Sequence, residues 1–262
     1  MIKRAINYAL SKFDLALHRY SSLEKMKIDL QRYSSDFRDI DFLRSLEDRD
    51  VVSSLRNLDR SKSQFRQDLF VLAELNYKRS GFFVEFGATN GIDSSNTFLL
   101  EKEYAWTGIL AEPAKVWHRE LLKNRDAHIE LSCVWSRSND SISFVETQDA
   151  VLSTATKFIS GDAHASNRQP RTRYVVNTIS LEDLLLKYDA PRYIDYLSID
   201  TEGSEFEILK EFDFRKYHFF IITCEHNFGP NRARIRKLLE RHGYKRKLEH
   251  VSCVDDWFVR DV

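Results

Sequence analysis

The chain has few of the residues that mark secreted, membrane-spanning or nucleic-acid-binding proteins. Its three cysteines are scattered and odd in number, which favours reduced core residues of a cytoplasmic protein over a disulfide framework. No apolar run approaches the roughly twenty residues that span a bilayer, and the N-terminus lacks the apolar core of a signal peptide. Basic and acidic residues balance at 40 each, which removes the electrostatic reason to expect a nucleic-acid partner.

The first sixty residues contain neither glycine nor proline, so we expect residues 1–62 to form a helical extension. Apolar residues recur there at helical spacing, at Ile2, Ile6, Ala9, Phe13, Leu17 and Tyr20. Basic residues lie between them, and one interpretation is a helix peripheral to the inner face of a membrane. The other is a helix that packs on its own domain or on a second subunit of a homo-oligomer.

From residue 63 to residue 262 strands and helices alternate, which predicts one α/β domain with a mostly parallel, Rossmann-like sheet and an antiparallel C-terminal strand. The expected strands are 82–86, 108–111, 128–134, 141–146, 175–179, 193–199, 219–224, 244–248 and 253–259. Residues 147–173 form a long polar stretch, and loops of that length are usually either functional or disordered.

A glycine turn follows the first expected strand. Gly87 and Gly91 come after the apolar run that contains Glu85, and they let the backbone approach a ligand without an intervening side chain. Their spacing does not fit the G-x-G-x-x-G fingerprint of dinucleotide sites, but it fits the loop of Rossmann-like S-adenosylmethionine methyltransferases. The next strand ends at Glu112, where an ionised carboxylate can accept hydrogen bonds from two ribose hydroxyls. The two strand ends together predict an adenosine-binding domain.

Two later strands also end in polar groups. Asp200 follows the strand 193–199, and Glu225, His226 and Asn227 follow the run 219–224. Because parallel strands end at one edge of a sheet, we expect these side chains to lie close together. Oxygen ligands from Asp200, Glu225 and Asn227 suit Mg²⁺ or another hard divalent cation. The alternative is that they only hydrogen-bond the substrate.

The sequence resembles the FkbM family of S-adenosylmethionine-dependent methyltransferases over roughly residues 63–260. The resemblance is carried by Phe83–Gly91, Ser95–Thr97, Trp106–Pro113 and Leu197–Glu205, the last of which holds the family's D-x-E-G-x-E element. It implies a class I methyltransferase fold and O-methylation of a hydroxyl on a sugar, a polysaccharide precursor or a related natural product. The expected cofactor-binding residues are Glu85, Gly87, Ala88, Asn90, Gly91, Ser95, Asn96, Glu112 and Pro113.

Methyl transfer to a hydroxyl oxygen also needs a group that removes the hydroxyl proton. His226 is the expected general base, because its reference pKa near 6.5 lets it accept a proton at neutral pH. His164, in the long polar stretch, is a second candidate. A cation held by Asp200 and Glu225 could instead acidify the hydroxyl directly, and the two roles can coexist.

The polar stretch also carries candidate substrate contacts. Arg168, Arg171 and Arg173 could close over a phosphate or carboxylate of a phosphorylated or lipid-linked saccharide. The alternative is that they form a solvated basic loop. We also place Glu202, from the D-x-E-G-x-E element, among the substrate contacts.

Two other functions stay open at this point. A nicotinamide-dependent oxidoreductase is disfavoured by the missing third glycine of the dinucleotide fingerprint. A non-catalytic cofactor-binding scaffold in a glycan assembly complex would be favoured if Asp200 and Glu225 were salt-bridged inside the fold with no open cavity.

Overall fold

The structure is a computed structural model that describes residues 37–160 and 164–260. The chain divides into two compact units, Met1–Ser45 and Leu46–Val262. In the first unit, residues 37–44 are helical; the amphipathic helix expected over residues 2–20 lies outside the described residues. No helix among the described residues is both long and apolar enough to cross a membrane.

The second unit begins earlier than the boundary at residue 62 that we expected. Helix α2 (Asp48–Asn57) belongs to it. Two side chains of α2 join it to later segments, because Ser54 Oγ lies 2.6 Å from the Tyr77 hydroxyl and Asn57 Nδ2 donates to the Tyr104 hydroxyl at 2.9 Å. These bonds place α2 with the α/β unit.

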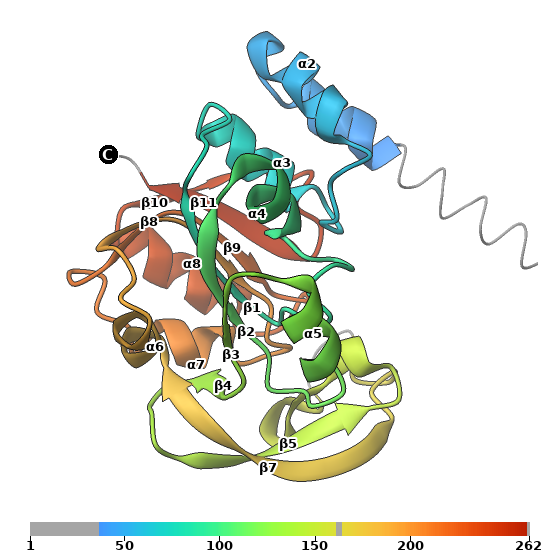
Figure 1. Ribbon diagram of the computed structural model, residues 1–262, viewed down its shortest axis with the longest axis vertical. Coiled ribbons are helices and arrows are strands. Elements are labelled where there is room, and N and C mark those ends of the chain that lie inside the picture. Colours follow the sequence, from blue (N-terminus) through green and yellow to red (C-terminus); the bar gives the residue numbers. More distant parts are fainter. Residues whose placement is uncertain (1–36, 161–163, 261–262) are drawn as a thin grey trace, which may run out of the picture. The chain divides into compact units, whose positions relative to one another are not determined.

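The main sheet has seven strands in the order β10-β11-β9-β8-β1-β2-β3 (Figure 1). Their bounds are β1 (Phe82–Phe86), β2 (Thr107–Ala111), β3 (His128–Glu130), β8 (Tyr193–Ile199), β9 (His218–Glu225), β10 (Tyr244–Lys247) and β11 (Asp255–Arg260). Strand β11 is antiparallel to both of its neighbours, whereas β9, β8, β1, β2 and β3 pair in parallel. The predicted mostly parallel sheet with an antiparallel C-terminal strand is confirmed.

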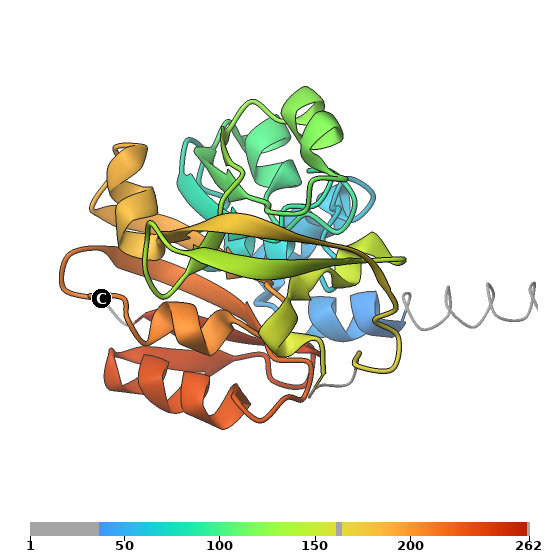
Figure 2. The same cartoon turned by 90° about the horizontal axis from the view of Figure 1, so that it is seen from below.

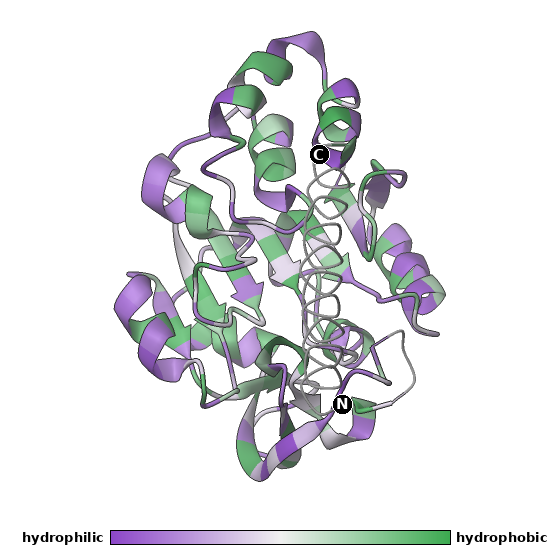
Figure 3. Cartoon of the chain, turned by 90° about the vertical axis from the view of Figure 1, so that its right-hand side faces the viewer, coloured by the Kyte–Doolittle hydropathy of each residue, from purple (hydrophilic) through white to green (hydrophobic). Residues whose placement is uncertain are grey.

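Helices cover both faces of this sheet. Figure 2 shows α4 and α5 on the opposite side from α7 and α8. The helices are α3 (Gln67–Glu74), α4 (Phe98–Tyr104), α5 (His118–Asn124), α6 (Leu181–Lys187), α7 (Glu205–Leu209) and α8 (Arg232–Arg241). Because helices cover both faces, the central strands read as continuous apolar runs, and Figure 3 shows them largely in the colour of hydrophobic residues. In β8, every residue after Tyr193 is buried.

A second sheet of four strands, in the order β4-β7-β5-β6, was not predicted. Its strands are β4 (Cys133–Trp135), β5 (Ser141–Thr147), β6 (Thr154–Ala155) and β7 (Pro170–Ser180), with 3-10 turns at Ala150–Leu152 and Thr156–Phe158. The long antiparallel β5–β7 ribbon crosses the lower part of Figure 1.

Two sequence predictions about this region were wrong. The single strand expected over 128–134 is two strands, β3 and β4, which belong to different sheets. The polar stretch 147–173 contains β6 and the start of β7. A two-residue strand has no periodicity to detect, and the first four residues of β7 are all exposed, so no apolar alternation marks them.

Candidate active site

One cavity of about 400 Å³ lies at the carboxyl ends of the parallel strands. Its floor comes from the ends of β1, β2, β8 and β9 and the segments that follow them, and its cover comes from the second sheet, residues 149–153, His164 and Asn167. The predicted site residues that line it are Gly87, Glu112, Pro113, His164, Asp200, Glu202 and Glu225. Residues from four strand ends that we expected to converge therefore share one cavity.

The turn after β1 touches the end of β8. Gly87 has a φ of +76°, a region that favours glycine. A Cβ on Gly87 would lie 2.0 Å from the Asp200 carbonyl oxygen, so only glycine fits this contact. The next residue, Ala88, is buried, and its N–H donates to the Ala111 carbonyl at 3.3 Å. The glycine thus brings the turn and the acidic end of β8 into one wall of the cavity.

Glu112 stands at the end of β2 and is 5% exposed. Its Oε2 accepts the Thr89 N–H at 2.8 Å and its Oε1 accepts the Ala114 N–H at 2.7 Å. Burial, with a smaller contribution from the nearby Glu146 carboxylate, raises the pKa of Glu112 to about 7 despite these two bonds. Each oxygen keeps a further acceptor position, and Glu112 is among the residues that line the cavity.

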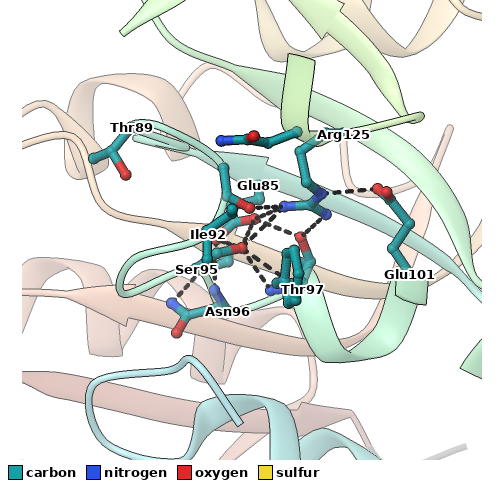
Figure 4. Close-up of polar contacts among 12 residues, drawn as sticks. Glu85, Thr89, Ile92, Ser95, Asn96, Thr97, Glu101 and Arg125 are labelled. Atoms are coloured by element: carbon teal, nitrogen blue, oxygen red, sulfur yellow. Dashed lines mark hydrogen bonds and ion pairs between the residues drawn. The ribbon is translucent and has the colours of Figure 1, made fainter. Parts of the chain in front are cut away.

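Glu85 does not line the cavity, although it was expected to bind the cofactor. Its carboxylate is 3% exposed and accepts hydrogen bonds from the Asn96 N–H at 2.7 Å and from the Ser95 and Thr97 hydroxyls (Figure 4). The Arg125 guanidinium lies 3.8 Å away. Glu85 therefore binds the chain that follows the turn.

Other residues expected to bind the cofactor also have partners within the protein. Asn90 Oδ1 accepts the N–H groups of Ile92 and Asp93, both at 2.9 Å. Gly91 has a φ of +80°, and a Cβ there would lie 2.6 Å from Arg125 Cγ. Ser95 and Asn96 are buried against Glu85. These residues shape the turn from behind and do not line the cavity.

Three carboxylates gather where β8 and β9 end. One oxygen from each of Asp200, Glu202 and Glu225 lies within 4.8 Å of the others. Removal from water and mutual repulsion hold the pKa values of Asp200 and Glu225 well above their ordinary range, and a hydrogen bond joins the two side chains. Each of the two carboxylates therefore favours protonation more than a carboxyl in water does.

Glu202 has a cationic partner that the sequence did not reveal. The guanidinium of the buried Arg168 donates to Glu202 Oε2 and, at 3.3 Å, to the Phe158 carbonyl. Arg171 and Arg173 are exposed on β7 and do not line the cavity. The predicted clamp of three arginines is therefore not assembled, because one guanidinium is bound inside the protein and two project from an outer strand.

His226 does not fit the role of general base. Its Nδ1 accepts the Phe228 N–H at 3.0 Å, and its Nε2 lies 3.6 Å from Asp256 Oδ1. Burial lowers the pKa of His226, so the ring is neutral with its proton on Nε2. Neither nitrogen then has a lone pair for a substrate proton. The residue also faces a separate cavity of about 140 Å³ and not the larger one.

Asn227 lies beside the carboxylates without joining the three that are mutually close. Its Nδ2 lies 3.4 Å from Glu202 Oε2, and the residue is 3% exposed. Its Oδ1 has no hydrogen-bond partner among the described residues. The amide thus has an unused oxygen near the cluster to which we assigned it.

Several residues that build the site were not singled out from the sequence. Asp93 and Asp149 add carboxylates to the cavity wall, and Trp117, Phe144 and Leu152 add apolar surface. Arg125 and Glu101 support the glycine turn from behind. Nothing in the sequence links Arg125 to a turn more than thirty residues earlier.

The strand order with one antiparallel strand, the glycine turn after β1 and the carboxylate after β2 are features of a Rossmann-like α/β fold. The family model of the methyltransferase FkbM domain matches residues 85–246, which is more than half of the chain. The chain belongs to the FkbM methyltransferase family.

Solved structures give weaker likenesses. Methyltransferase FkbM from Methylobacillus flagellatus KT is 13% identical with a TM-score of 0.43, and the match covers 84% of this chain and 58% of that one. PH1948 from Pyrococcus horikoshii, by its name a candidate RNA methyltransferase, is 12% identical with a TM-score of 0.38, and the match covers 75% of this chain and 82% of that one. Neither likeness carries an argument about function. Among curated proteins, no sequence matches this chain.

Proposed function

We propose that the protein transfers the methyl group of S-adenosylmethionine to a hydroxyl oxygen of a sugar or glycan. The observation that carries the proposal is the single cavity that joins Glu112 after β2 to the carboxylates Asp200 and Glu225 after β8 and β9. In open α/β sheets, ligands bind at this edge, where the strand order reverses between β1 and β8. One cavity can therefore place a cofactor and an acceptor side by side.

The residues of the first half of the cavity fit the cofactor. Gly87 lets the turn pack directly on the Asp200 carbonyl at the cavity wall, and Glu112 offers carboxylate oxygens to the two ribose hydroxyls. When bound, S-adenosylmethionine supplies a methyl group activated by attachment to a positively charged sulfur. What the protein adds is alignment of this group with the acceptor oxygen and exclusion of water from the cavity.

The residues of the second half act on the acceptor hydroxyl. Since His226 has no lone pair available, we assign proton acceptance to the Asp200–Glu225 pair, which lines the cavity. Removal from water and the neighbouring carboxylates raise the pKa values of the pair, which makes it a stronger base than a carboxylate in water. His164 also lines the cavity and is the second candidate.

The same carboxylates support a divalent cation as an alternative route. Three oxygens within 4.8 Å of one another suit a hard cation, which would relieve their repulsion. Asn227 can add its unused amide oxygen. These residues would hold Mg²⁺ or a similar ion and lower the pKa of an acceptor hydroxyl bound to it.

The charge of the cavity bears on the class of acceptor. Six carboxylates line it, from Asp93, Glu112, Asp149, Asp200, Glu202 and Glu225, and the described lining contains neither lysine nor arginine. A phosphate or carboxylate on the acceptor would be repelled by those of these groups that are ionised. We therefore narrow the proposal to an acceptor that is uncharged where it enters the cavity. The condition set for a non-catalytic scaffold is not met, since Asp200 and Glu225 line an open cavity.

The test is calorimetric titration of the wild type and Glu112→Ala with S-adenosylhomocysteine, and with NAD as the control ligand. We expect micromolar binding of S-adenosylhomocysteine that is lost in Glu112→Ala, and no binding of NAD. Binding of NAD in place of S-adenosylhomocysteine would overturn the proposal.

A second titration addresses the cation. Mn²⁺ binding is followed by electron paramagnetic resonance in the wild type and in Asp200→Asn. Binding at one site that Asp200→Asn abolishes supports metal assistance, and equal weak binding by both proteins would exclude it.

A further inference from the structure

The Arg125 side chain is fully buried although it carries a charge. It follows the last residue of α5, and its side chain is 0% exposed. The guanidinium carbon lies 5.6 Å from the Phe83 ring centroid and 5.8 Å from that of Phe98. Burying a cation is costly unless hydrogen bonds and a counter-charge satisfy it. Here Glu101 Oε2 supplies the closest counter-charge, 2.9 Å from Nε.

The remaining N–H groups of Arg125 bind the segment that follows β1. Nη1 donates to the Gly91 carbonyl and to Ser95 Oγ, both at 3.0 Å, and Nη2 donates to Thr97 Oγ1 at 2.9 Å (Figure 4). The contact with Gly91 is tight, since a Cβ on this glycine would collide with the arginine. The adjacent Asn124 adds a bond to the Asn90 carbonyl at 2.8 Å.

The same segment reaches the cavity on its other side. Thr89 both lines the cavity and donates its N–H to Glu112, the residue placed at the ribose end of the site. Residues 89–97 therefore lie between Glu112 in front and Arg125 behind. A shift of the Gly91 carbonyl would be passed through two residues of backbone to the Thr89 N–H.

We propose that Arg125 is a positioning residue for the cofactor: it fixes residues 89–97 so that the Thr89 N–H holds the Glu112 carboxylate in its binding orientation. The inference rests on the proposed cofactor site. Lysine cannot replace the arginine, because one ammonium cannot reach Glu101, Gly91 and Thr97 from a planar fork of donors.

Asp195 provides a matched control at the opposite edge of the sheet. It is 5% exposed, it is the third residue of β8 and so lies near the start of the strand, and its carboxylate accepts from Lys78 Nζ at 2.7 Å and from the Phe82 N–H at 2.9 Å. Asp195→Asn therefore removes a buried charge of the same sheet without touching the cavity.

The experiment titrates S-adenosylhomocysteine calorimetrically into the wild type, Arg125→Lys and Asp195→Asn, and records Kd and stoichiometry separately. For Arg125→Lys we expect a Kd raised about tenfold at unchanged stoichiometry. A change of this size corresponds to the loss of one hydrogen bond that involves a charged group. Asp195→Asn is expected to keep the wild-type Kd with a lower melting temperature. An unchanged Kd with reduced stoichiometry in Arg125→Lys would show a merely structural role and overturn the inference.

Amide hydrogen exchange on the protein without ligand separates this inference from the proposed function. We expect faster exchange over residues 89–97 in Arg125→Lys and not in Asp195→Asn. If the wild type binds no S-adenosylhomocysteine but this difference is found, the cofactor proposal fails while the support of the turn stands; no difference overturns the support itself. Should Arg125→Lys not fold, Glu101→Gln serves instead, with a Kd raised about threefold because the guanidinium keeps its other bonds.

Discussion

The ends of β1 and β8, two neighbouring strands, each carry an acidic side chain, buried at Glu85 and partly exposed at Asp200, and the two sites differ in what surrounds the carboxylate. Around Glu85 there are a backbone N–H, two hydroxyls and, within 3.8 Å, the Arg125 guanidinium. Around Asp200 there are mainly other carboxylates. A buried charge that the fold already satisfies has no capacity left for a ligand, whereas an unsatisfied one costs stability until a ligand, a proton or a cation arrives. The carboxylate of Glu85 therefore stabilises the fold, whereas the carboxylate of Asp200 can act on a ligand.

The largest expected effect comes from breaking the satisfied site. Arg125→Met leaves the carboxylates of Glu85 and Glu101 without their buried cation, and should lower the free energy of unfolding by about 3–5 kcal/mol. The double variant Glu85→Gln/Arg125→Met removes one of the two orphaned charges and should recover part of this loss. Urea denaturation of the two variants and of Glu85→Gln measures the coupling energy between Glu85 and Arg125. Additive losses in the free energy of unfolding would contradict this coupling.

Glu112 is an intermediate case, because two backbone N–H groups hold it and no cation does. Its pKa of about 7 predicts that affinity for S-adenosylhomocysteine is constant above pH 8 and falls as pH drops through 7, approaching tenfold per unit. The reason is that a protonated carboxyl can no longer accept from two hydroxyls. Titrations of S-adenosylhomocysteine from pH 5.5 to 8.5 test this. The affinity of Glu112→Gln is expected to be weak and independent of pH.

At the unsatisfied site, removing a charge should stabilise the protein. The raised pKa of Asp200 means that its contribution is most favourable at low pH and is lost as pH rises through the folded-state pKa. Asp200→Asn should therefore be more stable than the wild type by about 1 kcal/mol at pH 8, with a smaller gain at pH 5. Denaturation of both proteins at pH 5 and pH 8 measures the difference in the free energy of unfolding. A less stable Asp200→Asn at pH 8 would mean that other groups already balance the charges of the three carboxylates.

The smallest effect is expected at His226. Since its Nδ1 already accepts from Phe228 and its Nε2 faces Asp256, His226→Gln should change the rate of methyl transfer by less than about threefold. Glu225→Gln, which alters the cavity-lining pair, is the comparison and should lose at least a hundredfold. A hundredfold loss in His226→Gln would restore the histidine as the base.

The sequence predicted the strands that carry the site because they are continuous apolar runs that end in polar groups. Residues 82–86 and 193–199 were placed as the structure has them, and parallel pairing then brought Gly87, Glu112, Asp200 and Glu225 together. The sequence could not tell that Glu85 faces away from the cavity. That depends on Arg125, which lies forty positions further along the chain and meets Glu85 only after α5 has packed.

The second sheet was missed for a related reason. Parts of its longer strands β5 and β7 were expected, as 141–146 and 175–179, but β4 is paired with residues of β7 that lie 45 positions later, and its three residues show no pattern of their own. The structure also does not bring together Arg168, Arg171 and Arg173, which we expected to contact the substrate. Arg171 and Arg173 lie on an exposed strand, and only the ion pair with Glu202 shows what Arg168 does.

The pairing of β4 with β7 also bears on how the segment between them could be exchanged. Cys133 and Thr178 are hydrogen-bonded neighbours, so the whole second sheet leaves the main fold and returns to it within one strand spacing. A segment whose two ends meet in this way can be exchanged, lengthened or shortened as a cassette while the seven-stranded sheet keeps its register. Cys133 and Thr178 are thus the natural pair of junctions for building a chimaera.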